Sequence, residues 1–92
     1  MRVTIEYFGP AREAAGTACE EIDCEPPCSA QDLATRIARD RGGRLAALVL
    51  RDDRLSAVML LAVNDRQVAA EPVPLQDGDV ISIIPPVSGG AR

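Results

Sequence analysis

Two consecutive glycines near the C-terminus, Gly89 and Gly90, are the residues of this sequence that point most directly to chemistry. They follow Pro85-Pro86, and each proline fixes its φ angle, which stiffens the exit from the preceding segment. A Gly-Gly segment carries no side chains, so its backbone can enter a narrow channel and approach a nucleotide closely. A frayed terminus would explain two glycines alone. It does not explain their place shortly after a Pro-Pro strand end, at the close of the strand pattern.

The other residue types leave little room for an enzyme active site. The chain contains no His, which removes Ser–His and Cys–His nucleophile pairs and the commonest metal ligand. Gly42-Gly43 lacks the spacing of a phosphate-binding loop. The acidic pairs Glu20-Glu21 and Asp52-Asp53 fit a solvated strand end and a turn better than a catalytic carboxylate pair. We therefore expect no bound cofactor and no metal.

The cysteines fit neither a disulfide framework nor an iron–sulfur site. An odd number of thiols in a chain without secretory features does not indicate a disulfide framework. The plant-type ferredoxin pattern needs C-x4-C-x2-C and a distant fourth Cys. Cys19, Cys24 and Cys28 are spaced C-x4-C-x3-C and have no fourth. We expect loop or half-buried thiols, and the cysteine count argues against an electron carrier.

Size, charge and apolar runs limit the class of protein. The 92 residues fit one domain, and a hydrophobic share of 47% allows a core. The net charge of −4, without a basic cluster, argues against nucleic-acid binding and leaves docking on a basic protein surface open. No apolar signal segment follows Met1, and the longest apolar run, 57–63, is too short to cross a membrane. We expect a cytoplasmic protein without membrane contact.

The first half of the chain predicts a hairpin followed by a helix. Residues 2–8 alternate between apolar and polar, as in a strand with one buried face, and a short helical turn at 11–15 leads to a second strand at 17–22. Ser29, with Asp32 three residues later, has the pattern of a helix start. Gly42-Gly43 predicts its end, and a second short helix fits 45–50.

The second half predicts further strands, at 57–63, 67–69 and 80–84, with a turn at Asp52-Asp53. A hairpin, a crossover helix and more strands give an α+β protein of the β-grasp (ubiquitin-like) class. We expect a mixed sheet of about five strands with one main helix on one face. Residues 1–87 would form the domain and residues 88–92 a flexible tail.

The strand alternation assigns side chains to faces. Phe8 and Ile84 alternate with the inward positions, so we expect them to face outward and form one apolar patch beside the tail. The residues predicted to be mostly buried are Val3, Ile5, Tyr7, Leu33, Ile37, Leu61, Val63, Ile81 and Ile83.

Four segments together resemble the molybdopterin synthase small subunit, a family of ubiquitin-like sulfur carriers related to MoaD and ThiS. They are YFGPAREAAG at 7–16, LAVN at 61–64, LQDGDV at 75–80 and IIPPVSGG at 83–90. The likeness covers residues 1–90, and the closing block is its specific part.

The resemblance implies a small non-catalytic carrier subunit of a sulfurtransferase. An E1-like partner would adenylate the terminal glycine carboxylate with ATP, which belongs to that partner, and the carboxylate would become a thiocarboxylate. The synthase large subunit would then receive the tail and use its sulfur to build molybdopterin. Gly89 and Gly90 would carry the chemistry. The partner contacts would be Phe8, Ile84, Pro85, Pro86, Val87 and Ser88.

One departure from the family concerns the last two residues. Family chains end at the second glycine, whereas this one continues with Ala91-Arg92. Either a protease removes this dipeptide, or the chain is inactive as a carrier, or its partner differs. We expect removal, because a bulky charged residue does not fit a channel built for Gly-Gly. Two alternatives stay open: a carrier for another pathway, such as cysteine, thiamine or a secondary metabolite, and a protein modifier attached to lysine through Gly90.

Overall fold

The structure, a computed structural model, describes residues 1–68 and 72–86. The elements in chain order are β1 (Arg2–Tyr7), α1 (Pro10–Ala15), β2 (Cys19–Asp23), α2 (Ala30–Arg41), α3 (Gly43–Val49), β3 (Leu50–Arg51), β4 (Arg54–Leu55), β5 (Leu60–Val63), β6 (Arg66–Gln67) and β7 (Val80–Ile84). The predicted boundary between a domain at 1–87 and a tail at 88–92 lies outside the described residues.

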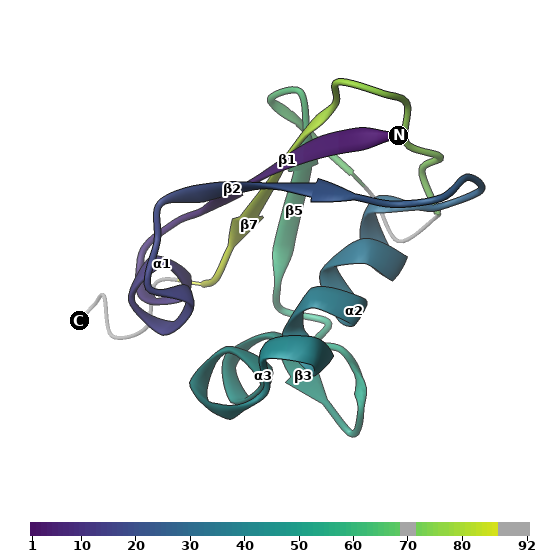
Figure 1. The fold of residues 1–92 in the computed structure, drawn as a ribbon. Helices are drawn as coiled ribbons and strands as arrows, with labels where there is room; N and C mark the ends of the chain where they lie inside the picture. The colour runs from purple at the N-terminus through teal and green to yellow at the C-terminus, as the bar shows by residue number, and fades with distance from the viewer. Residues whose placement is uncertain (69–71, 87–92) are drawn as a thin grey trace.

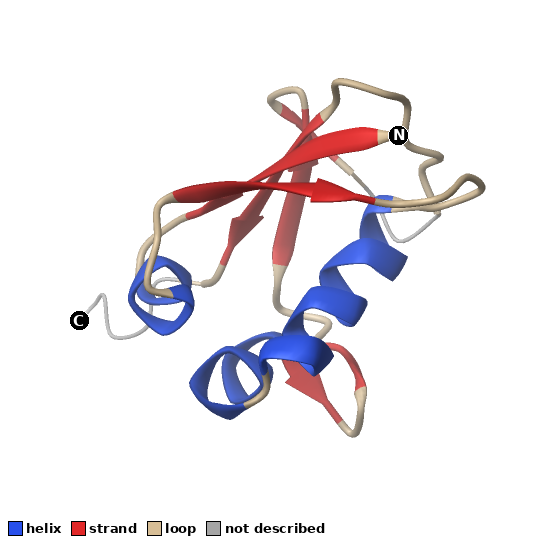
Figure 2. Cartoon of the chain, viewed as in Figure 1, coloured by secondary structure: helices blue, strands red, loops and turns tan. Residues whose placement is uncertain are grey.

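Five strands form one mixed sheet in the order β2-β1-β7-β5-β6. The central pair, β1 and β7, is parallel, and the other neighbouring pairs are antiparallel. All three helices lie on the same side of this sheet (Figures 1 and 2). The α+β, β-grasp prediction is confirmed. The predicted main helix is α2, with 12 residues, and two shorter helices accompany it.

The ends of α2 follow from its sequence. The Ser29 hydroxyl accepts a hydrogen bond from the Asp32 backbone N–H at 3.0 Å, which satisfies a donor in the first turn. Arg39 and Arg41 lie in the last turn, where positive charge favours the helix dipole. Gly42 ends the helix with a φ angle of 62°, which glycine adopts without a steric penalty. The predicted cap and end are both confirmed.

The core lies between the sheet and the helices. Eight of the nine predicted core residues are buried, and Val63 is partly buried. Ile5 and Ile83 are both at most 1% exposed, which confirms the predicted register. Leu45 and Val49 of α3 also belong to the core.

The apolar run at 57–63 forms a shorter strand than predicted. Ala57 and Val58 lie in a turn, and Val58 is 61% exposed. The Met59 backbone N–H donates to the Ser56 carbonyl at 3.1 Å, which closes that turn before β5 begins. A continuous apolar run does not reveal where pairing starts, because the pairing depends on distant β7.

Smaller differences occur elsewhere. The Asp52-Asp53 turn was predicted, but the two-residue strands β3 and β4 beside it were not. Both aspartates have positive φ angles, 54° and 63°, as a type I′ hairpin turn requires. Several elements differ from the predicted ranges by one or two residues at their ends, namely β1, β2, β6 and α3. Residue 69 of the predicted strand 67–69 lies outside the described residues.

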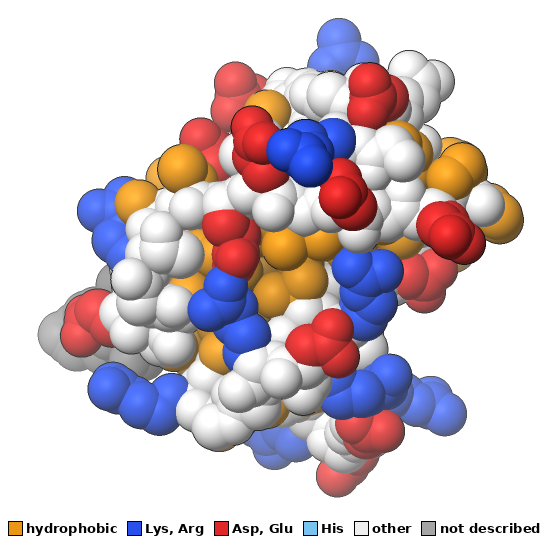
Figure 3. Space-filling view, viewed as in Figure 1, with side chains coloured by type: hydrophobic (Ala, Val, Ile, Leu, Met, Phe, Trp, Pro, Cys, Tyr) orange, Lys and Arg blue, Asp and Glu red, His pale blue; other side chains and the backbone are white. Residues whose placement is uncertain are grey.

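A polar network links the sheet to the helices. The Tyr7 hydroxyl donates to Glu20 Oε2 at 2.5 Å. Arg41 contacts the same carboxylate and also donates through Nη1 to the Ala15 carbonyl at 3.1 Å. Figure 3 shows this side of the molecule, with hydrophobic side chains visible between sheet and helices and charged side chains beside them. The network ties the end of α2 to β2 and α1.

Burial of the Tyr7 phenol, helped by its hydrogen bond to Glu20, raises the pKa of Tyr7 well above its ordinary value. The unfolded chain releases this proton above about pH 10, whereas the folded chain holds it. The free energy of unfolding therefore falls by about 1.4 kcal/mol per pH unit above that point. We expect Tyr7→Phe to lose about 1–2 kcal/mol of stability at neutral pH and to lack the part of the alkaline slope that Tyr7 contributes.

Urea unfolding between pH 8 and pH 11 measures both effects. Tyr7 is the only Tyr, so the phenolate absorbance reports its titration alone. All ten basic residues are arginines, so no lysine titration contributes to the alkaline slope of the unfolding free energy. Full phenolate absorbance of the folded chain just above the ordinary pKa would contradict the prediction.

Candidate functional site

The sheet face that points away from the helices carries an apolar row formed by three strands. Tyr7 pairs with Ile83, so the next residues, Phe8 and Ile84, lie side by side. The Phe8 backbone N–H donates to the Ile83 carbonyl at 3.2 Å, which holds this register beyond the end of β1. Leu60 pairs with Ile84 from the other side. We call Phe8, Ile84 and Leu60 the apolar row.

The predicted outward patch is confirmed by this geometry. Phe8 is 40% exposed, and Ile84 is half-buried between its neighbours. Sequence reasoning missed Leu60, which is 42% exposed. Alternation within β5 could have found it, because Leu61 faces the core and adjacent residues point to opposite faces. Large exposed apolar side chains that gather on a small domain are typical of a partner surface.

The chain leaves the sheet beside the apolar row. β7 ends at Ile84, and Pro85 and Pro86 follow it directly. Pro86 is exposed, whereas Pro85 is buried within this chain, which leaves most of the predicted prolyl contact with a partner to Pro86. The other predicted site residues, Val87, Ser88, Gly89 and Gly90, lie outside the described residues, so their roles stay predictions.

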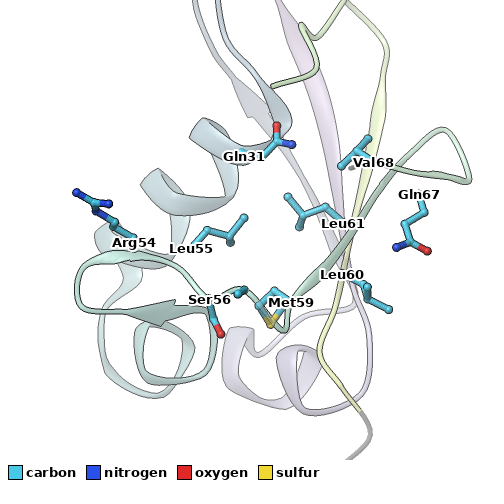
Figure 4. Close-up of a pocket in the computed structure, with 10 residues that line it drawn as sticks. Gln31, Arg54, Leu55, Ser56, Met59, Leu60, Leu61, Gln67 and Val68 are labelled. Carbon is cyan, nitrogen blue, oxygen red and sulfur yellow. The ribbon is translucent and has the colours of Figure 1, made fainter. Parts of the chain in front are cut away.

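A cavity of about 500 Å³ lies between the start of α2, the β3–β4 hairpin and β5 (Figure 4). Leu55 and Leu61 point into it from opposite sides, whereas Arg54 and Gln67 point away. Leu60 lines its rim and also belongs to the apolar row. The lining is mainly apolar, which suits an apolar side chain and not a reacting group. The sequence did not predict this cavity, because its walls come from segments far apart along the chain.

The thiols do not form a reactive centre. Burial raises the pKa of the Cys28 thiol, with a contribution from the neighbouring Cys24 thiol, so Cys28 stays protonated at neutral pH. Cys19 is exposed and Cys24 is buried. Among residues 1–68 and 72–86, no group of three His, Cys, Asp or Glu side chains could hold a metal ion. None of the helices in these ranges is long and apolar enough to cross a membrane.

The fold, the apolar row and the Gly-Gly sequence can be compared with known proteins. The model of the ThiS family matches residues 5–90, which include Gly89 and Gly90. The chain belongs to the ThiS family. This assignment agrees with the resemblance carried by the closing block of the sequence.

Curated relatives of this ThiS-family chain are similar over nearly their whole length. The molybdopterin synthase sulfur carrier subunit of Chlamydomonas reinhardtii is 30% identical, with 98% of this chain and 100% of the relative covered. The subunit of the same name from Drosophila erecta is 28% identical, with 98% and 92% covered.

Solved structures agree on the fold. SAMP1 from Haloferax volcanii superposes with a TM-score of 0.84 over 98% of this ThiS-family chain and 100% of its own, at 23% identity, which shows a shared fold. A chain in the complex of subunits 1 and 2 of the molybdopterin-converting factor from Helicobacter pylori has a TM-score of 0.65 and 29% identity. That match covers 98% of this chain and 100% of the other.

Proposed function

We propose that this ThiS-family chain is a sulfur carrier for molybdopterin synthesis and that Gly90 is its carrier end. The observation that carries the proposal is the family match through residue 90, which includes both glycines of the tail. Two relatives of similar length are named molybdopterin synthase sulfur carrier subunits, which supports the same pathway. The carrier itself needs no active site, in keeping with a sequence that has no His.

The carrier chemistry takes place at the C-terminal carboxylate. The Gly90 carboxylate attacks the α-phosphorus of ATP on an E1-like partner, and pyrophosphate leaves. A sulfur nucleophile at the oxidation level of sulfide then displaces AMP from the acyl adenylate, which leaves a thiocarboxylate on Gly90. ATP and the groups that activate it belong to the partner, so this chain binds no cofactor.

The apolar row is the surface proposed to dock on the synthase large subunit. Phe8 is an aromatic side chain at an exposed position, and aromatic anchors often contribute much of the binding energy at protein interfaces. The row lies where β7 ends, so a partner seated on it is next to the start of the tail. The complex of subunits 1 and 2 from Helicobacter pylori supports a partner of this kind.

The proposed function requires a protease that removes Ala91-Arg92. In the full-length chain the Gly90 carbonyl belongs to the peptide bond with Ala91, and an amide carbonyl cannot be adenylated as a carboxylate can. Removal of Ala91-Arg92 creates the free carboxylate that the carrier chemistry needs.

Intact-mass measurement of the protein purified from its native cell tests the proposed function. We expect a mass that lacks Ala91 and Arg92, together with a form in which one oxygen is exchanged for sulfur. Iodoacetamide labelling at acidic pH, where the cysteine thiols are protonated, serves as the control for the position of that sulfur. A protein that keeps its full mass and never carries the additional sulfur would contradict the proposal.

A further inference from the structure

One carboxylate on the outer sheet face has no positive partner among the described residues. Glu6 lies in β1, two residues before Phe8, and pairs across the sheet with Ser82 of β7. The Ser82 hydroxyl donates to Glu6 Oε1 at 3.4 Å, and Ser82 is only 4% exposed. Glu6 itself is half-buried. This carboxylate therefore lies directly beside the apolar row.

The arginine that β1 places on this face already contacts other carboxylates. Arg2, also on β1, contacts Glu21 Oε1 at 3.0 Å and Asp23 Oδ1 at 3.1 Å, both on β2. The charged positions of this face on β1 and β2 are thus three carboxylates and one guanidinium. These four side chains carry a net charge of −2, and of the three carboxylates only Glu6, next to the surface that a partner would cover, has no contact with Arg2.

A partner that covers the apolar row also removes water from Glu6. A buried carboxylate without a positive partner is strongly unfavourable, because its desolvation free energy exceeds the stabilisation from one hydrogen bond to a hydroxyl. A partner that left Glu6 unpaired would therefore bind weakly. Charge complementarity at such a position selects the correct partner and speeds its association.

We propose that the partner presents a lysine or arginine side chain to Glu6, beside an apolar surface that covers Phe8, Ile84 and Leu60. The inference rests on the proposed docking to the synthase large subunit and specifies the chemistry of that subunit's contact surface. Glu6 acts as a specificity residue for docking and takes no part in the reaction at Gly90.

The test measures binding of the processed chain, which ends at Gly90, to the purified large subunit by titration calorimetry at two salt concentrations, and every variant is made in this processed form. We expect Glu6→Gln to raise the Kd by at least about thirtyfold, and Glu6→Lys to raise it further. Raising the salt concentration should weaken binding of the unchanged chain more than binding of Glu6→Gln. Asp40→Asn changes the net charge by the same amount at an exposed position of α2, on the other side of the sheet. This variant should bind with the Kd of the unchanged chain.

Each outcome supports or overturns the role of Glu6 in docking. Equal Kd values for the unchanged chain and Glu6→Gln, with the same salt dependence, overturn the role of Glu6 and leave the proposed function standing. No binding by the unchanged chain overturns the proposed docking and the role of Glu6 with it. Thermal unfolding of Glu6→Gln should match that of the unchanged chain, and a loss of binding accompanied by unfolding would count against the proposal.

Discussion

A chain truncated after Gly90 is expected to become thiocarboxylated when it is incubated with its E1-like partner, ATP and a sulfur source. The chain that still carries Ala91-Arg92 is expected to stay unmodified, because its Gly90 carbonyl is in an amide bond. We expect thiocarboxylation of the truncated chain and none of the other, because without a free carboxylate on Gly90 no binding to the partner can lead to adenylation. Mass spectrometry of the two chains after equal incubation measures it.

Two controls accompany the truncation. Adding a protease that removes Ala91-Arg92 should restore modification of the full-length chain. Replacing Gly90 by valine in the truncated chain should abolish turnover, because a side chain blocks close approach to the nucleotide. Thermal unfolding of that variant should be nearly unchanged. Full-length protein that carried sulfur as fast as the truncated chain, without cleavage, would show that processing is not required.

Two adjacent isoleucines of β7 should give opposite results when each is replaced by alanine. Ile83 is 1% exposed and faces the core, so Ile83→Ala should lower the free energy of unfolding by about 2–5 kcal/mol. Ile84 belongs to the apolar row, so Ile84→Ala should cost the fold about 1 kcal/mol or less. It should weaken binding to the large subunit by about tenfold or more, and Phe8→Ala should do the same.

Urea unfolding and titration calorimetry separate the two effects. Val58→Ala is the matched control for binding, because Val58 is an exposed aliphatic residue in the turn before β5, outside the apolar row. Unchanged binding in both Ile84→Ala and Phe8→Ala would show that the partner does not use this row. A similar loss of stability in Ile83→Ala and Ile84→Ala would show that the two faces of β7 are not distinct.

The parts of the fold that could be predicted from sequence are those specified locally. In β1 and β7 one face is buried, so the alternation of side chains shows both the strand and its register. The start of α2 depends on the contact between Ser29 and Asp32, which are three residues apart. The patch at Phe8 and Ile84 then followed from alternation together with the expected neighbours β1 and β7.

The parts that could not be predicted depend on distant partners. β5 starts at Leu60 because pairing with Ile84 begins there, and nothing within the apolar run marks that position. The cavity beside Leu55 is formed by α2, a short hairpin and β5, whose relative positions no local pattern specifies. Glu6 was not singled out either, because its isolation is visible only when the ion pairs of Arg2 are known.

The parallel pairing of β1 with β7 also bears on when a newly made chain can be recognised. Thr4 pairs with Val80, 76 residues further along the chain, so β1 cannot complete its pairing until that segment has been synthesised. Contacts between positions so far apart in sequence form late and slowly during folding. The apolar row needs Phe8, Leu60 and Ile84 side by side, so a chain in which these strands have not yet paired does not present it. A partner that binds this row would therefore select chains in which all three strands have come together.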